Sequence, residues 1–486
     1  MLGVLHFLTQ VLGCLALAML APAAIAVIGG EGGNAESFLL VAGLTGFVAG
    51  AIFLALRGRR WRLDRSAVFV LVLAVWIVPP LIAAIPIMAV SRIAYFPALF
   101  EAVSAYTTTG ASVFASIEPL RPAVVFWRAE LQWLGGLMTL ISIVTVMAPV
   151  GVGGLTSRNV APLGPTGDGS LIRSLATART VAAIYTMATV LCICLLLLAG
   201  IPVFDAVGLA FSTVSTGGFM PADGDIGTYR RPLAELVVML FMLIGATSIV
   251  WHRMILQGRW AQAIAHRESY WVIGVALVVG LAYAAAYSAS TDSAAEASAL
   301  SALRDGLFSG ISLVTTTGFE TRAGGLAGLP IAIVAVLGIV GAGAISTAGG
   351  IKFYRIGGMF IQSMHELKRL VYPHSVRSTH FGSQPYDINL MKAMWTGAIV
   401  GLAFVGVATL LINFNHPSFH GGALAVISAF SNIGPLYATA WDGYSGWPEF
   451  GQFDAFSKVV LIVVMIVGRI EAVALLGLVN LAYWRS

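Results

Sequence analysis

The chain has 486 residues, of which 10% are charged and 58% are hydrophobic. A soluble protein carries about a quarter charged residues, so these few charges cannot cover the two or three soluble domains that this length would form. The formal net charge of +5 arises from basic residues in short runs beside apolar segments, which indicates membrane topology rather than nucleic-acid binding. Cys14, Cys192 and Cys194 lie in apolar runs without disulfide or zinc spacing. The composition predicts an all-α polytopic membrane protein.

Ten apolar runs approach the roughly 20-residue length of a membrane-spanning helix. They begin near Leu2, Phe38, Ala67, Val124, Val181, Leu233, Tyr270, Ile331, Ile388 and Val459. The first run lacks the Lys/Arg-rich start of a secretory signal, so we expect a retained helix. An even number of spans puts both termini on one side. Most Lys and Arg residues then fall on that side, which indicates that both termini are cytoplasmic.

Glycines interrupt the eighth run before its apolar pattern resumes at Ile351 and continues toward Val371. These glycines are Gly338, Gly341, Gly343, Gly349 and Gly350. A glycine run both breaks a helix and allows alternative backbone paths. Residues 341–350 are therefore predicted to form an intramembrane loop that could gate a pore. A close-packed glycine kink without motion is the alternative.

An internal repeat is the strongest signal in the chain. Four segments read SAYTTTGASVF from Ser104, FSTVSTGGFMP from Phe211, SLVTTTGFETR from Ser312 and AFSNIGPLYAT from Ala429. Aligned on Gly110, Gly217, Gly318 and Gly434, they recur at intervals of 107, 101 and 116 residues. Each unit holds two predicted spans with one short apolar segment between them.

The apolar stretch before each glycine is about a dozen residues long, enough helix to cross only half of the membrane. We interpret these stretches as re-entrant pore helices. Asp205 and Asp305 are expected to cap the second and third of them. Non-helical backbone at membrane depth must be buried in protein or line a water-filled cavity, so the four turns predict a pore. Their carbonyls would replace the hydration shell of a monovalent cation, most consistent with potassium. Small-residue contacts between ordinary helices are the alternative.

Arg469 and Glu101 are ionisable residues within predicted membrane segments. Arg469 lies near the middle of the last span, where an ionisable residue indicates function, although structural pairing with Glu130 is an alternative. Glu101 lies within the first pore helix, and we expect it to form hydrogen bonds behind the turn. The sequence contains no convergent acid, base or metal-ligand cluster, so we do not expect an enzyme.

With these segments, the chain resembles the membrane subunit of the Trk/Ktr potassium-uptake systems over nearly its whole length. The four repeats carry the resemblance, together with WRAELQWLGGL from Trp127, VGVGGL from Val150, STAGGIKFYRI from Ser346, HELKRLVYPHSV from His365 and GRIE from Gly468. The family implies four tandem helix, pore-helix, helix units around one pore. The corresponding boundaries are 1–60 for two extra N-terminal helices and 61–155, 156–265, 266–375 and 376–486 for the repeats, the third with a broken second helix.

By position, the resemblance implies a selectivity filter whose backbone carbonyls hold K⁺. Its residues are Thr108, Thr109, Gly110 and Ala111; Ser215, Thr216, Gly217 and Gly218; Thr316, Thr317, Gly318 and Phe319; and Asn432, Ile433, Gly434 and Pro435. The fourth segment departs from the family pattern, because Asn432 replaces a hydroxyl residue and Leu436 stands where glycine is usual. The implied gate consists of Gly341, Gly343, Ser346, Thr347, Gly349, Gly350 and Arg469. Arg469 is placed below the filter, where it would oppose cation passage or hold the gate loop by hydrogen bonds to its carbonyls.

The resemblance further implies potassium uptake across a bacterial cytoplasmic membrane by a homodimer, with no organic cofactor in this chain. It also implies a cytoplasmic nucleotide-binding regulatory ring of the TrkA/KtrA type. The basic stretch from His365 to Arg377 could contact that ring or lipid headgroups. A weakly selective K⁺/Na⁺ conductor and a symporter coupled to H⁺ or Na⁺ stay open as alternatives, although a symporter would need more ionisable residues at mid-membrane.

Overall fold

The computed structural model describes residues 2–58, 65–147, 170–290, 299–372, 380–381, 384–385, 388–416, 418–439 and 447–470. The VGVGGL motif, the end of HELKRLVYPHSV and the glutamate of GRIE lie outside these residues. The elements are α1 (Leu2–Ala18), α2 (Leu20–Ile28), α3 (Gly32–Leu56), α4 (Arg65–Ser91), α5 (Tyr95–Tyr106), α6 (Pro122–Ser142), η1 (Ile143–Met147), α9 (Ser170–Leu198), α10 (Val203–Val214), η4 (Ile226–Tyr229), α11 (Pro232–Ala246), α12 (Ile249–Leu256), α13 (Trp260–Ala265), α14 (Arg267–Ser290), α15 (Ala299–Val314), η5 (Gly325–Gly328), α16 (Ile331–Val340), α17 (Phe353–Val371), β1 (His380–Phe381), β2 (Gln384–Pro385), α18 (Ile388–Asn413), α19 (Phe419–Phe430), α20 (Gly434–Thr439) and α21 (Ala455–Ile470). The two short strands pair antiparallel, and the rest of the fold is a bundle of helices.

The long helices confirm a polytopic membrane protein. Six of them, within the described residues, are long and apolar enough to span a membrane. They are Leu2–Ile28, Gly32–Leu56, Phe69–Ser91, Ala176–Leu198, Arg267–Ala289 and Met391–Asn413. These six match six of the ten predicted spans. The runs predicted from Val124 and Val459 form α6 and α21, and α21 is described only as far as Ile470.

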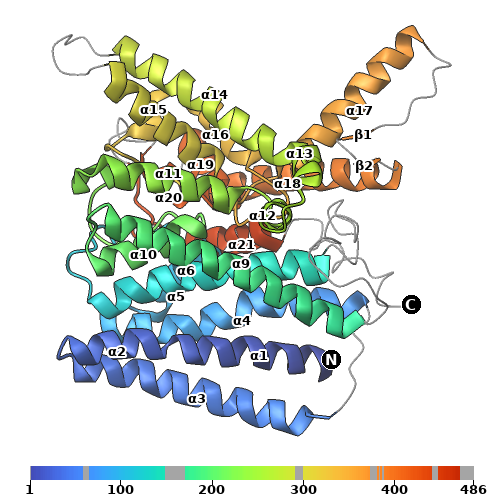
Figure 1. Ribbon diagram of the computed structural model, residues 1–486. Coiled ribbons are helices and arrows are strands. Elements are labelled where there is room, and N and C mark those ends of the chain that lie inside the picture. The colour runs from blue at the N-terminus through green and yellow to red at the C-terminus, as the bar shows by residue number, and fades with distance from the viewer. Residues whose placement is uncertain are drawn as a thin grey trace.

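The helices lie side by side in layers (Figure 1). Helices α1, α2 and α3 pack together on one flank, and α14 and α15 pack together on the other. Between these flanks α5 contacts α4 and α6, α10 contacts α6 and α9, and α19 contacts α18 and α21. Helix α17 projects away from the packed helices. The two N-terminal helices expected before the first repeat are thus an outer layer that leaves the centre to the repeats.

Four short helices occupy the repeat positions. Helices α5, α10 and α19 have 12 residues each and α15 has 16, and their C-terminal halves are buried. Twelve residues rise about 18 Å, roughly half of the apolar thickness of a bilayer. The predicted caps are wrong. The N-cap of α10 is Pro202, with Asp205 one turn inside, and Asp305 lies within α15, where it accepts a hydrogen bond from Arg304.

Two of the predicted spans are broken. The eighth is interrupted as expected, between the end of α16 at Val340 and the start of α17 at Phe353. The sixth, predicted as one span from Leu233, is instead bent by 104° between α11 and α12. Thr247 is extended there, and the N–H of Ile249 donates to the carbonyl of Ile345 at 2.9 Å. This second break depends on a contact with the interrupted eighth span, so local sequence did not reveal it.

Candidate functional site: four converging turns above an intramembrane loop

The four short helices end in turns that share one backbone course. Each turn has a residue in the left-handed region, with φ between 52° and 60°, at Thr108, Thr216, Thr316 and Asn432. Non-glycine residues rarely adopt this region. The next N–H then donates to a serine carbonyl five positions back, at 2.8 to 3.0 Å. The serines are Ser104, Ser212, Ser312 and Ser428. The repeat is therefore present in the backbone as well as in the sequence.

This backbone course corrects the alignment of the second segment by one residue. Gly218, with φ of 80°, is the equivalent of Gly110 (79°) and Gly318 (85°), whereas Gly217 occupies the position of Thr109. The second segment has two consecutive glycines, and sequence letters do not show which of them takes the positive φ. Only the hydrogen-bonding pattern distinguishes the two.

The turns meet one another directly. A Cβ atom on Gly110 would overlap the carbonyl oxygen of Gly217, and one on Gly218 would overlap that of Thr317. A Cβ atom on Gly434 would overlap the backbone of Gly110. The first segment thus touches the second, the second touches the third, and the fourth touches the first. Glycine is required at these positions because backbone from another segment occupies the space of a side chain.

The fourth segment departs from the other three after the shared turn. The chain enters α20 at Gly434, whose N–H donates to the carbonyl of Thr109 at 2.5 Å. Leu436 is buried, and its Cδ2 atom lies 3.4 Å from the Cβ position of Gly338. The backbone of the fourth segment is therefore helical from Gly434, although Asn432 keeps the left-handed turn of the other three.

The ring of Pro435 lies among the other three segments. Its Cδ atom is 3.3 Å from the Cβ position of Gly110 and 3.0 Å from that of Gly318, and its Cγ atom is 3.0 Å from that of Gly218. Three equivalent glycines from three repeats therefore surround one apolar ring. The space between the turns is therefore narrow beside Pro435.

A cavity of about 420 Å³ adjoins these glycines. Gly110, Gly218, Gly434 and Pro435 line it together with residues that follow the turns in the chain, and its charged lining residues include Arg128, Asp223 and Glu449. Burial alone would raise the pKa of Asp223, but hydrogen bonds from Ser116 and from the N–H groups of Ile117 and Glu118 lower it on balance. Asp223 is therefore ionised at neutral pH, and an anionic wall attracts cations.

The interrupted span forms a loop, residues 341–352, directly against the turns. The Oγ1 atom of Thr347 lies 3.3 Å from that of Thr216 and donates to the carbonyl of Gly245 at 2.9 Å. The N–H of Gly349 donates to the hydroxyl oxygen of Thr316 at 2.8 Å. A Cβ atom on Gly349 would overlap the carbonyl oxygen of Ser431. The loop thus contacts the second, third and fourth turns.

Arg469 connects the loop to the first turn. Its Nε atom donates to the carbonyl of Thr107 at 2.5 Å, and its Nη1 atom donates to that of Thr347 at 2.6 Å. The side chain is buried. The alternative pairing with Glu130 is not formed: Arg469 donates to the backbone carbonyls of Thr107, Thr347 and Ala348. The Oε2 atom of Glu130 is buried without a hydrogen bond to the described part of the chain. The expected hydrogen bonds from Arg469 to the loop are confirmed.

The other predicted gate residues lie in the same loop. Gly343 donates to the carbonyl of Ala246 at 3.0 Å, and Ser346 donates through its hydroxyl to Gly343 at 2.6 Å. Gly341 and Gly350 have φ of 67° and 78° and pack against each other. The structure therefore brings together all of Gly341, Gly343, Ser346, Thr347, Gly349 and Gly350.

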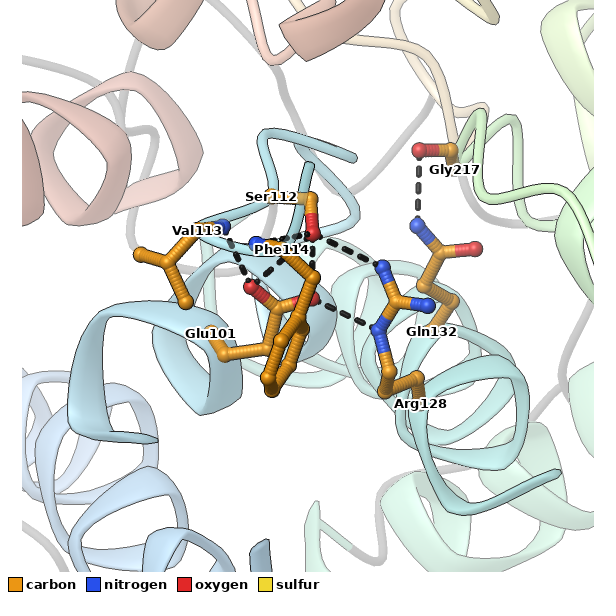
Figure 2. Close-up of polar contacts among 7 residues, drawn as sticks. All are labelled: Glu101, Ser112, Val113, Phe114, Arg128, Gln132 and Gly217. Carbon is orange, nitrogen blue, oxygen red and sulfur yellow. Dashed lines mark hydrogen bonds and ion pairs between the residues drawn. The ribbon is translucent and has the colours of Figure 1, made fainter. Parts of the chain in front are cut away.

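Glu101 braces the first turn from behind (Figure 2). Its carboxylate accepts hydrogen bonds from Arg128 Nε at 2.6 Å, the N–H of Val113 at 2.8 Å and the hydroxyl of Ser112 at 3.1 Å. This confirms the expected role of Glu101. Arg128 was not predicted from the sequence, nor was Glu268, which accepts a hydrogen bond from the N–H of Ala344 at 2.6 Å. A charged residue in an apolar run was the available signal for Arg128, whereas Glu268 follows His266 and Arg267 in a polar stretch and gave no such signal.

Comparison with known proteins identifies the family. The chain matches the family model of TrkH, cation transport protein, over residues 44–262 and 277–480. The chain belongs to the TrkH family. That family is one of transport proteins, and its match includes all four turns and the 341–352 loop.

Relatives of the family are similar over almost the whole chain. The chain is 31% identical to the Trk system potassium uptake protein TrkH of Salmonella typhimurium, covering 99% of this chain and all of that one. It is 28% identical to the TrkG protein of Escherichia coli, covering 90% of this chain and 91% of that one. The crystal structure of the potassium transporter TrkH from Vibrio parahaemolyticus matches with a TM-score of 0.85 and 27% identity, covering 100% of this chain and 99% of that one. These matches confirm the resemblance inferred from the motifs.

We predict that Pro435→Ala increases the rate of cation uptake severalfold, because it removes the ring that lies among Gly110, Gly218 and Gly318. The measurement is initial uptake into vesicles that contain the purified protein. Pro330→Ala, at the N-cap of α16 and outside the turns, is the matched control and is expected to leave uptake unchanged. An unchanged or lower rate for Pro435→Ala would show that the ring does not restrict the passage of cations between the turns.

Proposed function

We propose that this chain takes up potassium across the cytoplasmic membrane by passive conduction between the four turns. The observation that carries the proposal is the convergence of four buried turns between a cavity with an anionic wall and an intramembrane loop. Such turns present carbonyl and hydroxyl oxygens at membrane depth, which suits replacement of a cation's hydration shell. The relatives named as potassium uptake proteins support K⁺ as the cation.

The filter residues in this proposal follow the corrected alignment. The equivalent positions are Thr109, Gly217, Thr317 and Ile433, followed by Gly110, Gly218, Gly318 and Gly434. Both termini are placed in the cytoplasm by the bias of Lys and Arg, so the cavity faces outward and the loop faces inward. An inside-negative membrane potential favours cation entry by roughly 2.3 kcal/mol per charge per 100 mV.

A weakly selective K⁺/Na⁺ conductor is the second candidate, and the fourth segment favours it. Three segments have the glycine with positive φ, whereas Gly434 begins a helix. The four segments are therefore not equivalent at the position of these glycines. A filter whose carbonyls are placed less uniformly is expected to discriminate less between K⁺ and Na⁺.

The 341–352 loop with Arg469 is the gate in this proposal. Arg469 holds the loop against the first turn through two carbonyls, those of Thr107 and Thr347. Loss of these hydrogen bonds would free the loop at the point where the break between α16 and α17 already allows motion. The guanidinium also places a positive charge below the turns, where it opposes a cation.

A homodimer is the proposed assembly, with α17 at its interface. This helix projects from the bundle and exposes Phe360, Leu367 and Val371, which lie seven and four residues apart and so share one face. A two-fold pairing would bury the same face on both copies. Lys368 and Arg369, in the last turn of α17, are proposed contacts of a cytoplasmic nucleotide-binding ring.

The proposed function predicts that vesicles with the purified protein take up K⁺ well above Na⁺ when an inside-negative potential is imposed. Gly318→Asp is expected to abolish uptake, because Gly318 has φ of 85° and is packed against Pro435. Gly30→Asp is the matched control, since Gly30 also has positive φ but has nothing within 4 Å of its Cβ position. Equal K⁺ and Na⁺ uptake would support the weakly selective conductor. Uptake that requires a proton or sodium gradient would favour a symporter.

The gate proposal predicts that Arg469→Ala raises K⁺ uptake about tenfold or more, since a hydrogen bond from a charged donor contributes about 1.5–3 kcal/mol. Arg469→Lys keeps the positive charge but loses the planar guanidinium that reaches two carbonyls. It therefore tests whether the charge or the hydrogen bonds to the loop restrict uptake. If the loop contact dominates, the lysine variant resembles the alanine variant. An unchanged rate for Arg469→Ala in monodisperse protein would contradict the gate role.

The assembly proposal predicts that Leu367→Glu converts the protein from two copies to one per particle, because it buries two carboxylates at a two-fold interface. The molar mass in detergent, from light scattering after size exclusion, is the measurement. Glu366→Gln is the control, as Glu366 is exposed and forms a surface ion pair with Arg369. A molar mass of one copy for the wild-type particle, or of two copies for the Leu367→Glu particle, would contradict this interface.

A further inference from the structure

Helix α6 presents two polar side chains to the turns from one face. Arg128 and Gln132 are four residues apart, so they lie one helical turn apart on the same side. Both are buried, at 1% and 0% exposure. Figure 2 shows them directed to different partners, Arg128 to the first segment and Gln132 to Gly217 of the second. A single helix face thus reaches two neighbouring segments.

Arg128 links the first segment to the second. Beyond its ion pair with Glu101, its Nη2 atom donates to the hydroxyl of Ser112 at 3.1 Å. Its guanidinium carbon lies 4.0 Å from the centre of the Phe219 ring, which directly follows Gly218. A guanidinium at this distance over an aromatic face is attracted to it. The cation is therefore compensated on both sides and is retained in a buried position.

Gln132 holds a backbone carbonyl at the junction of the same two segments. Its Nε2 atom donates to the carbonyl of Gly217 at 2.7 Å. That oxygen also fills the space that a Cβ atom on Gly110 would need. A Cβ atom on Gly217 would in turn overlap the Gln132 amide. The carbonyl is thus enclosed by the first segment on one side and by α6 on the other.

The equivalent helices of two other repeats are apolar at these positions. Gly135 of α6, Gly245 of α11 and Gly468 of α21 each lie where a Cβ atom would meet the last carbonyl of a short helix, which makes them equivalent. The residues three positions earlier are Gln132, Met242 and Met465, and those seven positions earlier are Arg128, Val238 and Leu461. All of these side chains are buried. At these two positions, α6 is the one of the three helices whose side chains can donate hydrogen bonds.

We propose that α6 acts as a polar brace for the first two segments, and that Gln132 is a positioning residue on which discrimination between K⁺ and Na⁺ depends. The inference rests on the proposed function, since it concerns the same filter. A cage of carbonyls distinguishes ions of different size only while its oxygens keep their positions. Gln132 prevents the Gly217 carbonyl from turning, and Arg128 keeps the flanking residues of both segments together.

The test is the ratio of K⁺ to Na⁺ uptake for Gln132→Met in vesicles under an imposed potential. Methionine is the residue that α11 and α21 carry at this position, so it fits the helix but cannot donate. The buried Gly217 carbonyl then lacks its donor, and we expect the ratio to fall about tenfold. Met242→Leu, a substitution of similar volume at the equivalent position of α11, is the matched control and should keep the wild-type ratio.

The outcomes separate this inference from the proposed function. A wild-type protein without potential-driven K⁺ uptake would overturn the proposed function itself. If monodisperse Gln132→Met keeps the wild-type ratio of K⁺ to Na⁺ uptake, the proposed role of Gln132 and α6 is overturned, whereas the proposed function is not. If Gln132→Met does not give monodisperse protein, Phe219→Leu decides, because it removes the aromatic face from Arg128 and leaves the ion pair with Glu101. A lower ratio for Phe219→Leu supports the brace, and an unchanged ratio refutes it.

Discussion

Backbone polar groups at the four turns are buried in the middle of an apolar bundle, where each of them needs a hydrogen-bond partner. The short helices end inside the bundle, where their last residues and the turns beyond them are buried. Side chains and other segments supply the donors. These donors are Gln132 to Gly217, Arg469 to Thr107, Ser428 to Ile433 and the N–H of Gly434 to Thr109. The remaining architecture follows from this requirement.

The same requirement explains the two broken helices. Helices that continued through α11–α12 and α16–α17 would satisfy their own backbone and would offer nothing to the turns. The breaks release N–H and carbonyl groups that then bond one another, as between Ile249 and Ile345, or bond the turns, as between Gly349 and Thr316. Arg469 completes this layer because its fork reaches two carbonyls from different segments. The loop is therefore a partner of the turns, which is the physical basis for assigning it a gate role.

The four segments are alike in backbone but different in support. The first is held by the guanidinium of Arg128 in α6, and the second by the amide of Gln132 in the same helix. The second and third also contact the loop through threonine hydroxyls. The fourth places a proline ring among the others and continues as a helix. A single polypeptide allows this asymmetry, since each repeat can change without changing the others. The distribution of polar support, rather than the repeat itself, is what the proposed selectivity depends on.

The sequence by itself determined the membrane class, six of the spans, the fourfold repeat, the interrupted eighth span and the presence of a charge, Arg469, inside an apolar run. Apolar length, glycine placement and a charge within an apolar run are local properties that the residue order shows directly. Only the tertiary structure decided that Gly218 rather than Gly217 takes the positive φ, that α11 and α12 are bent apart, that Gln132 holds the Gly217 carbonyl, and that the ring of Pro435 lies among three glycines. Each of these depends on contacts between segments far apart in the chain. Two adjacent glycines, or a glutamine in an apolar helix, look the same in a sequence whatever lies opposite them in space.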